Sequence, residues 1–206
     1  MPLLSYAEAL QRLLDAATVL PAAEYPLAAA AGRVAAGTVA SPGPVPRFRN
    51  AALDGYAVRG ADLGSGATTL RIAGRVLAGT LPAEPLAPGT AVAITTGAPL
   101  PAGADTVVPV ERSRATAGPG GVGQVVLEPG TPGGANVRGA GEDFAAGDPV
   151  VKAGTRLGPE ALMALGAAGV ATVLARGPVR VAVLTTGDEV HAAGEVAGAA
   201  GISDAN

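Results

Sequence analysis

The N-terminal segment carries apolar residues at the spacing of an amphipathic helix. Ser5 and Glu8 stand three residues apart, as in a capping box, where each side chain accepts a hydrogen bond from the other residue's N–H. Apolar side chains then recur every three or four residues until Pro21, which lacks the N–H that a helix needs. The sequence therefore predicts a helix from about Tyr6 to Ala17 with one apolar face.

Two further segments have helical character. Leu27–Val39 is rich in Ala and predicts one or two helical turns, although Gly32 interrupts it. Pro159 stands where the first residue of a helix is expected, and the run Glu160–Gly169 follows it with apolar residues on one face. Helical segments are thus expected on both sides of the middle of the chain.

The middle of the chain, from about Val45 to Val150, has a different pattern. Short apolar runs alternate with Gly and Pro pairs, which is typical of strands joined by tight turns. The runs are Leu70–Ile72, Arg75–Leu77, Ala91–Ile94, Thr106–Val110 and Val122–Leu127. Gly118–Gly123 predicts an exposed hairpin tip. We interpret this region as a small β-rich domain.

Near the C-terminus, Val179–Leu184 is almost entirely apolar and ends at Thr185. This pattern predicts a strand buried in a parallel α/β sheet, with a ligand-facing loop at its end. Such a strand needs neighbours, and the residues after it predict neither a second strand nor a crossover helix. Three alternatives follow: the chain is a fragment of a longer one, the strand pairs with Ala171–Leu174, or it pairs with another subunit.

These elements predict an α+β fold, in which a helical layer carries an inserted β-rich domain and is followed by the first strand of a truncated α/β domain. The expected boundaries are 1–44 with 149–175 for the helical linker and dimerisation domain, 45–148 for the inserted β-rich domain, and 176–206 for the start of the α/β domain.

Composition narrows the classes of function. The 206 residues are 49% hydrophobic, which is enough for a core, and the 31 Gly and 18 Pro disfavour a helical bundle. A net charge of -3 makes nucleic acid and acidic membranes poor partners. The chain has no Cys and no signal-peptide pattern, so we expect a soluble cytoplasmic protein. Its single histidine, His191, offers no multi-histidine metal site and is expected at the surface.

Residues that could bind a ligand follow the ends of several apolar runs. Thr95-Thr96-Gly97 and Thr185-Thr186-Gly187 both follow such runs, and their hydroxyls and N–H groups are of the kind that hold oxyanions. Acidic residues accompany turns and strand ends, at Asp54, Glu142-Asp143 and Asp188-Glu189. Carboxylates beside oxyanion donors suggest Mg²⁺ bridging to phosphate. Each of these features also has a purely structural interpretation. Asp54 can belong to an ordinary turn, Glu142-Asp143 can be a solvated acidic pair, and the Thr-Thr-Gly loops can be ordinary strand ends.

Four groups of residues occur together in the order and approximate spacing of a known family, the molybdopterin molybdenumtransferases, which includes the E domain of gephyrin. The groups are Asn50–Val58, Thr96–Pro99 followed by Pro101–Asp105, Arg138 with Gly141–Asp143, and Thr186–Glu189. The resemblance extends from the N-terminal helix to Ile202–Asn206, which is similar to a degraded form of a family motif ending in Asp-Ser-Asn.

This resemblance implies an enzyme of molybdenum cofactor biosynthesis. Such an enzyme inserts molybdate into adenylylated molybdopterin, releases AMP and needs Mg²⁺ to handle the phosphates. It also implies a homodimer whose active site is shared between subunits, and molybdopterin adenylyltransferase as a pathway partner.

The matching motifs imply roles for eight residues. The catalytic positions are Asp54, Thr96, Asp143 and Glu189, and the substrate-binding positions are Arg138, Glu142, Thr186 and Asp188. Within these sets we assign Asp188 and Glu189 to Mg²⁺ and phosphate, Thr96 and Arg138 to anion contacts, and Asp54 to orienting substrate or hydrated metal.

The chain also departs from the family. The family usually has Asp, Ser and Met where this chain has Arg49, Ala51 and Leu53, and Gly139 and Ala140 replace positions that are often basic. The family's α/β domain continues through a molybdopterin loop and lysines, followed by a C-terminal β domain, which these residues do not include. We therefore expect an N-terminal fragment unable to turn over alone. The alternative is a non-catalytic dimerising module for binding or assembly, and an unrelated sugar or nucleotide binder would explain only the Thr-Gly loops.

Overall fold

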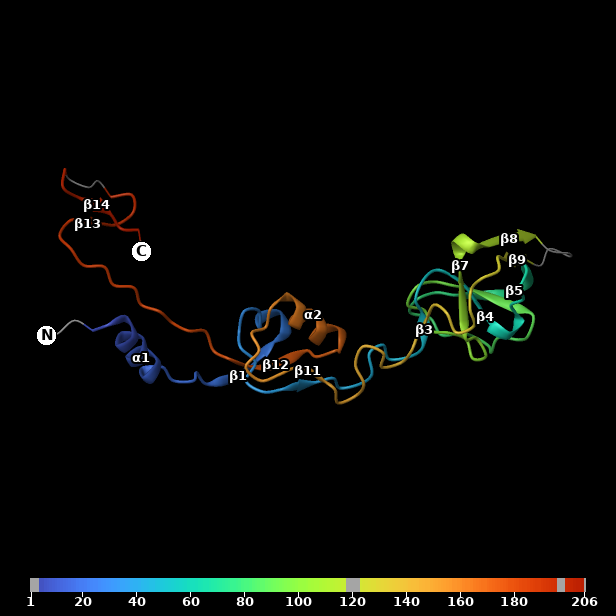
Figure 1. Cartoon of the computed structure of the whole chain (residues 1–206), viewed down its shortest axis with the longest axis horizontal. Coiled ribbons are helices and arrows are strands. Elements are labelled where there is room, and N and C mark those ends of the chain that lie inside the picture. The colour runs from blue at the N-terminus through green and yellow to red at the C-terminus, as the bar shows by residue number, and fades with distance from the viewer. Residues whose placement is uncertain (1–3, 118–122, 196–198, 206) are drawn as a thin grey trace. The chain divides into compact units, whose positions relative to one another are not determined.

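The computed structural model describes residues 4–117, 123–195 and 199–205 and divides into two compact units. One unit contains Met1–Ala23 and Arg176–Asn206, and the other contains Glu24–Ala175. Strands with few helices make the protein an α+β fold, as the sequence predicts (Figure 1).

The elements are, in chain order, α1 Tyr6–Ala16, β1 Ala22–Pro26, η1 Leu27–Ala29, β2 Val39–Ala40, β3 Asn50–Ala51, β4 Gly55–Val58, η2 Gly60–Asp62, β5 Thr68–Val76, β6 Thr90–Ile94, β7 Thr106–Pro109, η3 Val110–Arg112, β8 Ser113–Ala117, β9 Gly123–Leu127, β10 Val137–Arg138, β11 Pro149–Val151, α2 Pro159–Ala167, β12 Thr172–Arg176, β13 Val190–His191 and β14 Ile202–Ser203. The η elements are single turns of 3-10 helix. Among the described residues, no helix is long and apolar enough to cross a membrane.

The predicted N-terminal helix is present as α1, and its capping box is confirmed. The Ser5 hydroxyl accepts a hydrogen bond from the Glu8 N–H, and the Glu8 carboxylate accepts from the N–H and hydroxyl of Ser5. The apolar face of α1 is exposed in the described structure, with Tyr6 83% and Leu13 71% exposed. Local capping therefore defines the start of this helix, whereas core packing contributes little to it.

The predicted strand Val179–Leu184 is not formed. Its residues belong to no helix or strand, and Leu184 is 86% exposed. A strand is stable only when a neighbour satisfies its N–H and C=O groups, and no described residue pairs with this segment. The expected partner Ala171–Leu174 lies largely in β12, which pairs with β1 instead. The predicted pairing with Ala171–Leu174 is therefore wrong, whereas a strand that pairs within a longer chain or with another subunit stays a prediction.

The larger unit contains a described sheet of six strands in the order β7-β4-β6-β5-β9-β8. All neighbours are antiparallel except β5 and β6. Successive residues of one strand enter different cores: Val107 of β7 packs in one cluster with Val92 and Ile94, whereas Val108 packs in another with Val125. Both faces of the sheet are therefore covered, which explains why several strands are apolar runs without alternation.

The predicted strands of this region are confirmed with shifted boundaries. The runs Leu70–Ile72 and Arg75–Leu77 join into the single strand β5, although Leu77 lies just beyond its end. The sequence did not predict β4, which falls inside the Asp54 motif, or β8. The predicted hairpin tip at Gly118–Gly123 lies outside the described residues except for Gly123, where β9 begins.

A second core lies around α2, which begins at Pro159 as predicted. Leu157, Leu165 and Val173 are fully or almost fully buried there. The predicted helical turns at Leu27–Val39 are mostly wrong, because only η1 is helical. Beyond η1 the backbone pairs with distant segments instead, as when the N–H of Gly32 donates to the carbonyl of Leu157 at 2.9 Å.

Candidate functional site

Asp54 and Thr96 are brought together by the pairing of two strands. Asp54 directly precedes β4, Thr96 follows β6 by two residues, and the antiparallel register places Gly55 opposite Ile94. The Oδ1 atom of Asp54 accepts hydrogen bonds from the Thr96 N–H at 2.7 Å and from the Thr96 hydroxyl at 2.8 Å. Two residues assigned to the site from sequence therefore lie in direct contact.

These hydrogen bonds affect the charge of Asp54. The Thr96 N–H, and after it the Thr96 hydroxyl, lower the pKa of the Asp54 carboxyl below its ordinary value, and the positive charge of Arg75 acts weakly in the same direction. Asp54 is exposed, so desolvation opposes this effect only in part. The carboxylate is ionised at neutral pH and acts as an acceptor rather than a proton donor.

The backbone N–H groups of the first Thr-Thr-Gly loop and of the next residue all donate hydrogen bonds within the protein. The Thr95 N–H donates to the Val76 carbonyl, and the Thr96 N–H donates to the Asp54 carboxylate. The Gly97 N–H donates to the Ala51 carbonyl, and the Ala98 N–H donates to the Thr95 carbonyl. In this conformation none of these four donors is free for an anion. The loop positions the Asp54 carboxylate, and the role of Thr96 as an anion contact stays a prediction.

The strand β3 links this loop to the third motif. Ala51 pairs with Val137 of β10, and the Ala52 N–H donates to the carbonyl of Asn136 at 3.0 Å. On its other side, the Ala51 N–H donates to the Ala98 carbonyl at 3.0 Å. The Asp54, Thr96 and Arg138 motifs thus meet around Ala51 of β3 and Ala52 just after it, although they are far apart in the sequence.

Arg138 and the two acidic residues that follow it form one ion-pair group. The Arg138 guanidinium lies 2.6 Å from Asp143 Oδ1 and 3.4 Å from Glu142 Oε1. The other Glu142 oxygen accepts from the Gly139 N–H at 2.8 Å. These contacts, led by that to Asp143, raise the pKa of Arg138. An anion that binds Arg138 would therefore compete with two neighbouring carboxylates.

Gly55 allows β4 to approach β7 closely. A Cβ atom at this position would stand 2.0 Å from the carbonyl oxygen of Val108, and that oxygen belongs to the backbone of a paired strand. Only a residue without a side chain fits this spacing. The Asp-Gly pair is therefore not a simple turn: glycine admits the strand pairing that positions Asp54.

A cavity of about 360 Å³ opens beside Asp54, within the range of roughly 300 to 1,000 Å³ that is typical of ligand sites. Asp54, Tyr56, Arg75 and Thr95 contribute its polar side chains. Arg75 was not singled out from the sequence, where nothing distinguishes it from the other arginines of the β region.

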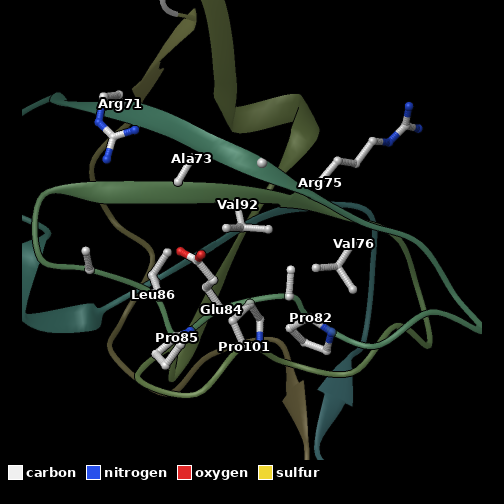
Figure 2. Close-up of a pocket in the computed structure, with 13 residues that line it drawn as sticks. Arg71, Ala73, Arg75, Val76, Pro82, Glu84, Pro85, Leu86, Val92 and Pro101 are labelled. Carbon is white, nitrogen blue, oxygen red and sulfur yellow. The ribbon is translucent and has the colours of Figure 1, made fainter.

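A second cavity, of about 260 Å³, lies beside β5 and β6 and contains none of the residues assigned from sequence, although Arg75 lines both cavities. Figure 2 shows Val76, Glu84, Leu86, Val92 and Pro101 around it, whereas the Arg75 side chain extends away from this group.

The remaining predicted residues belong to the other unit. Thr186, Asp188 and Glu189 are exposed there. Nearby, the Thr185 hydroxyl donates to Asp204 at 2.7 Å, and β13 pairs with β14. This contact joins the second Thr-Thr-Gly loop to part of the predicted C-terminal motif, whose last residue, Asn206, lies outside the described residues.

Asp188 and Glu189 provide oxygen ligands of the kind that Mg²⁺ prefers. No group of three or more His, Cys, Asp or Glu side chains able to hold a metal occurs in the described part of the chain. The two carboxylates therefore fit Mg²⁺ only in a shell completed by water and substrate oxygens.

Comparison with known proteins gives one consistent result. The family described as the MoeA N-terminal region (domain I and II) matches residues 4–169. A molybdopterin molybdenumtransferase of Synechococcus elongatus is 35% identical over 197 residues, which cover 91% of this chain and 47% of the relative. Molybdopterin molybdenumtransferase 2 of Mycobacterium tuberculosis is 40% identical over 174 residues, covering 82% of this chain and 42% of the relative.

Solved structures agree with these sequence matches. The crystal structure of the molybdopterin biosynthesis moeA protein from Pyrococcus horikoshii OT3 superimposes with a TM-score of 0.73 at 30% identity, covering 85% of this chain and 46% of that one. Another Pyrococcus moeA structure gives 0.69 at 31% identity and covers 98% of this chain. The chain spans about half the length of the relatives that it matches.

Proposed function

The chain belongs to the family of the MoeA N-terminal region, and from this membership we propose that it takes part in molybdenum cofactor biosynthesis as part of a molybdopterin molybdenumtransferase. The proposed reaction inserts molybdate into adenylylated molybdopterin and releases AMP. The observation that carries the proposal is the contact between Asp54 and Thr96 beside a cavity of ligand size.

Asp54 is proposed to orient the oxyanion or its bound water. Its Oδ1 atom is occupied by Thr96, whereas no described residue donates to Oδ2. An ionised carboxylate with one free oxygen accepts a hydrogen bond from a protonated oxygen of substrate. Because its pKa is lowered, Asp54 does so at neutral pH without first losing a proton.

The other motif residues are proposed to act around this carboxylate. Thr96 keeps Asp54 in one orientation in addition to its proposed anion contact. Arg138 is proposed to contact substrate anions while Glu142 and Asp143 balance its charge. Thr186 is proposed to bind substrate through its hydroxyl.

Asp188 and Glu189 are proposed to hold Mg²⁺ together with phosphate oxygens of the substrate. When bound there, the ion would neutralise part of the phosphate charge. The protein's own contribution would be two exposed carboxylates on one short segment.

We further propose the domain organisation and assembly that the resemblance implies. In this proposal a helical layer carries the inserted β-rich domain, an α/β domain follows, and two copies form a homodimer with a shared active site. Molybdopterin adenylyltransferase is the proposed source of the adenylylated substrate. The described residues would then contribute one part of the catalytic site and would not turn over alone.

The exposed apolar face of α1 favours a second candidate function. Tyr6, Leu10, Leu13 and Leu14 are all exposed, which is unusual for a row of large apolar side chains on one helix. This face is expected in a module that binds or assembles with other chains without catalysing turnover.

One experiment separates the two candidates. The purified chain is incubated with adenylylated molybdopterin, molybdate and Mg²⁺, and three quantities are measured: bound adenylylated molybdopterin, free AMP and molybdenum cofactor. Release of AMP with cofactor formation would exclude the non-catalytic module. Binding of adenylylated molybdopterin without AMP release supports a chain that supplies only part of the site, and the absence of both contradicts the proposed function.

A further inference from the structure

The cavity beside Asp54 needs a positive group, which the Thr-Thr-Gly loop does not provide. The backbone N–H groups of residues 95–98 are all donated within the protein, and the Thr96 hydroxyl is donated to Asp54. The negative charge of Asp54 itself would repel an anion. An oxyanion in this cavity therefore requires a positive group that faces Asp54.

Arg75 is the one cationic residue among the described residues that line the cavity. Its side chain is exposed and forms no hydrogen bond or ion pair with any described residue. This distinguishes it from Arg138, whose guanidinium is already held by two carboxylates. Arg75 thus keeps its five N–H donors available for a ligand.

An irregularity in β5 directs Arg75 into this cavity. Arg71 pairs with Thr90 and Arg75 with Ala93, and the register between β5 and β6 shifts by one residue between Ile72 and Gly74. Residues four apart in a regular strand share a face, but one extra residue reverses the alternation. By this register Arg71 shares a face with Thr90, and Arg75 shares the opposite face with Ala93. Arg75 lines the second cavity as well, but Arg71 does not line the cavity beside Asp54.

We propose that Arg75 is the anion-binding residue of the Asp54 cavity, where its guanidinium holds a tetrahedral oxyanion between itself, the Thr95 hydroxyl and the free oxygen of Asp54. The ligand class is an oxyanion, either molybdate or a phosphoryl group of the nucleotide part. This inference rests on the proposed function for the identity of the oxyanion. The position of Arg75 in the cavity does not depend on that identity.

The chemistry of the three groups is complementary. A planar guanidinium donates two parallel hydrogen bonds to oxygens of one anion. The Thr95 hydroxyl accepts from the Ala78 N–H at 3.0 Å, so its hydrogen remains available to donate. The free oxygen of Asp54 then accepts from a protonated oxygen of a phosphoryl group or from a water molecule bound to molybdate, which offsets repulsion between the two negative charges.

The test is a titration of the full chain with sodium molybdate, inorganic phosphate and AMP in separate experiments. NMR follows the Arg75 Nε–H and Thr96 N–H signals. The variants are Arg75→Ala, Arg75→Lys and, as a matched control from the same strand, Arg71→Ala. Circular dichroism melting checks that each variant is folded.

We expect saturable shifts of both signals in the wild-type chain and unchanged affinity in Arg71→Ala. Affinity should fall about tenfold or more in Arg75→Ala, with a smaller loss in Arg75→Lys, which keeps the charge but not the paired donors. The oxyanion that binds most tightly identifies the source as molybdate or phosphoryl group. If Arg75→Ala binds as tightly as wild type, or if no oxyanion shifts the wild-type signals, the inference is overturned. Neither result depends on AMP release, so the proposed function is judged separately.

Discussion

Asp54 and Thr96, 42 residues apart in the sequence, are joined by two hydrogen bonds to a single carboxylate oxygen. The contact follows from the pairing of β4 with β6, which brings the residue before one strand beside the loop after the other. The second carboxylate oxygen of Asp54 accepts no hydrogen bond from a described residue. Asp54 is exposed, and it lines the same cavity as Arg75.

The Thr96→Val variant is expected to raise the pKa of Asp54 toward its ordinary value. The hydroxyl donor is lost, but the N–H donor, which lowers the pKa most, remains. The shift should therefore be partial, whereas Thr96→Ser should keep the wild-type pKa. Carboxyl ¹³C NMR against pH measures it, and equal pKa values in wild type and Thr96→Val would contradict the role of the hydroxyl.

The same hydrogen bonds predict a pH dependence of stability. Because the pKa of Asp54 is lower in the folded state than in the unfolded state, its contribution to the free energy of unfolding is present above the unfolded pKa. It is lost as pH falls through the folded pKa. Chemical denaturation of wild type and Thr96→Val should therefore differ at neutral pH and converge in acid; a difference that persists below the folded pKa would point to lost packing instead.

The Asp54→Ala variant should retain the fold and lose function in a full-length enzyme. Asp54 is exposed and packs against no core cluster, so its removal leaves no cavity. Thermal unfolding should show only a small fall in the midpoint, which reflects the two lost hydrogen bonds from Thr96. A large fall in the midpoint would mean that Asp54 is mainly structural.

The Gly55→Ala variant should destabilise the β-rich region by about 1 to 3 kcal/mol, because the added Cβ would overlap the Val108 carbonyl. Gly37→Ala is the control, since a Cβ at Gly37 meets nothing within 4 Å. That variant should be neutral or slightly more stable. Urea denaturation measures both, and similar stability of the two variants would show that β4 can move away from β7.

Leu165→Ala should cost about 2 to 5 kcal/mol, because Leu165 is the fully buried side chain of α2. Leu13→Ala removes the same atoms from the exposed face of α1, and its effect should stay within about 0.5 kcal/mol. Equal losses in the two variants would mean that α1 is packed in solution, for example against another chain.

Local signals in the sequence predicted the elements whose ends are determined locally. Ser5 with Glu8 gave the start of α1, and Pro159 gave the start of α2. The longer apolar runs predicted β6 and β7, because a strand buried on both faces needs an unbroken run of apolar residues. Shorter apolar runs predicted β5 and β9, which are only partly buried. Val179–Leu184 has the same composition and forms no strand, since strand formation depends on a partner that composition does not reveal.

The sequence predicted which residues belong to the candidate site, but it did not predict which of them are in contact. The motif match identified Asp54 and Thr96, but only the register of β4 and β6 shows that Thr96 donates to Asp54. Arg75 was missed because a one-residue shift in β5 determines its face, and the spacing from Arg71 suggests the opposite face. Long-range register is set by pairing across the sheet, which a single sequence does not display.

The central claim is that Asp54 belongs to a ligand site of this chain and not merely to a loop. Calorimetric titration with adenylylated molybdopterin in the presence of Mg²⁺ and molybdate, on wild type, Asp54→Asn and Arg71→Ala, tests it most directly. The account predicts saturable binding by wild type and Arg71→Ala, and binding weakened at least about tenfold in Asp54→Asn, which keeps the shape but not the charge. Equal affinity in all three proteins, or no binding by any of them, would contradict it.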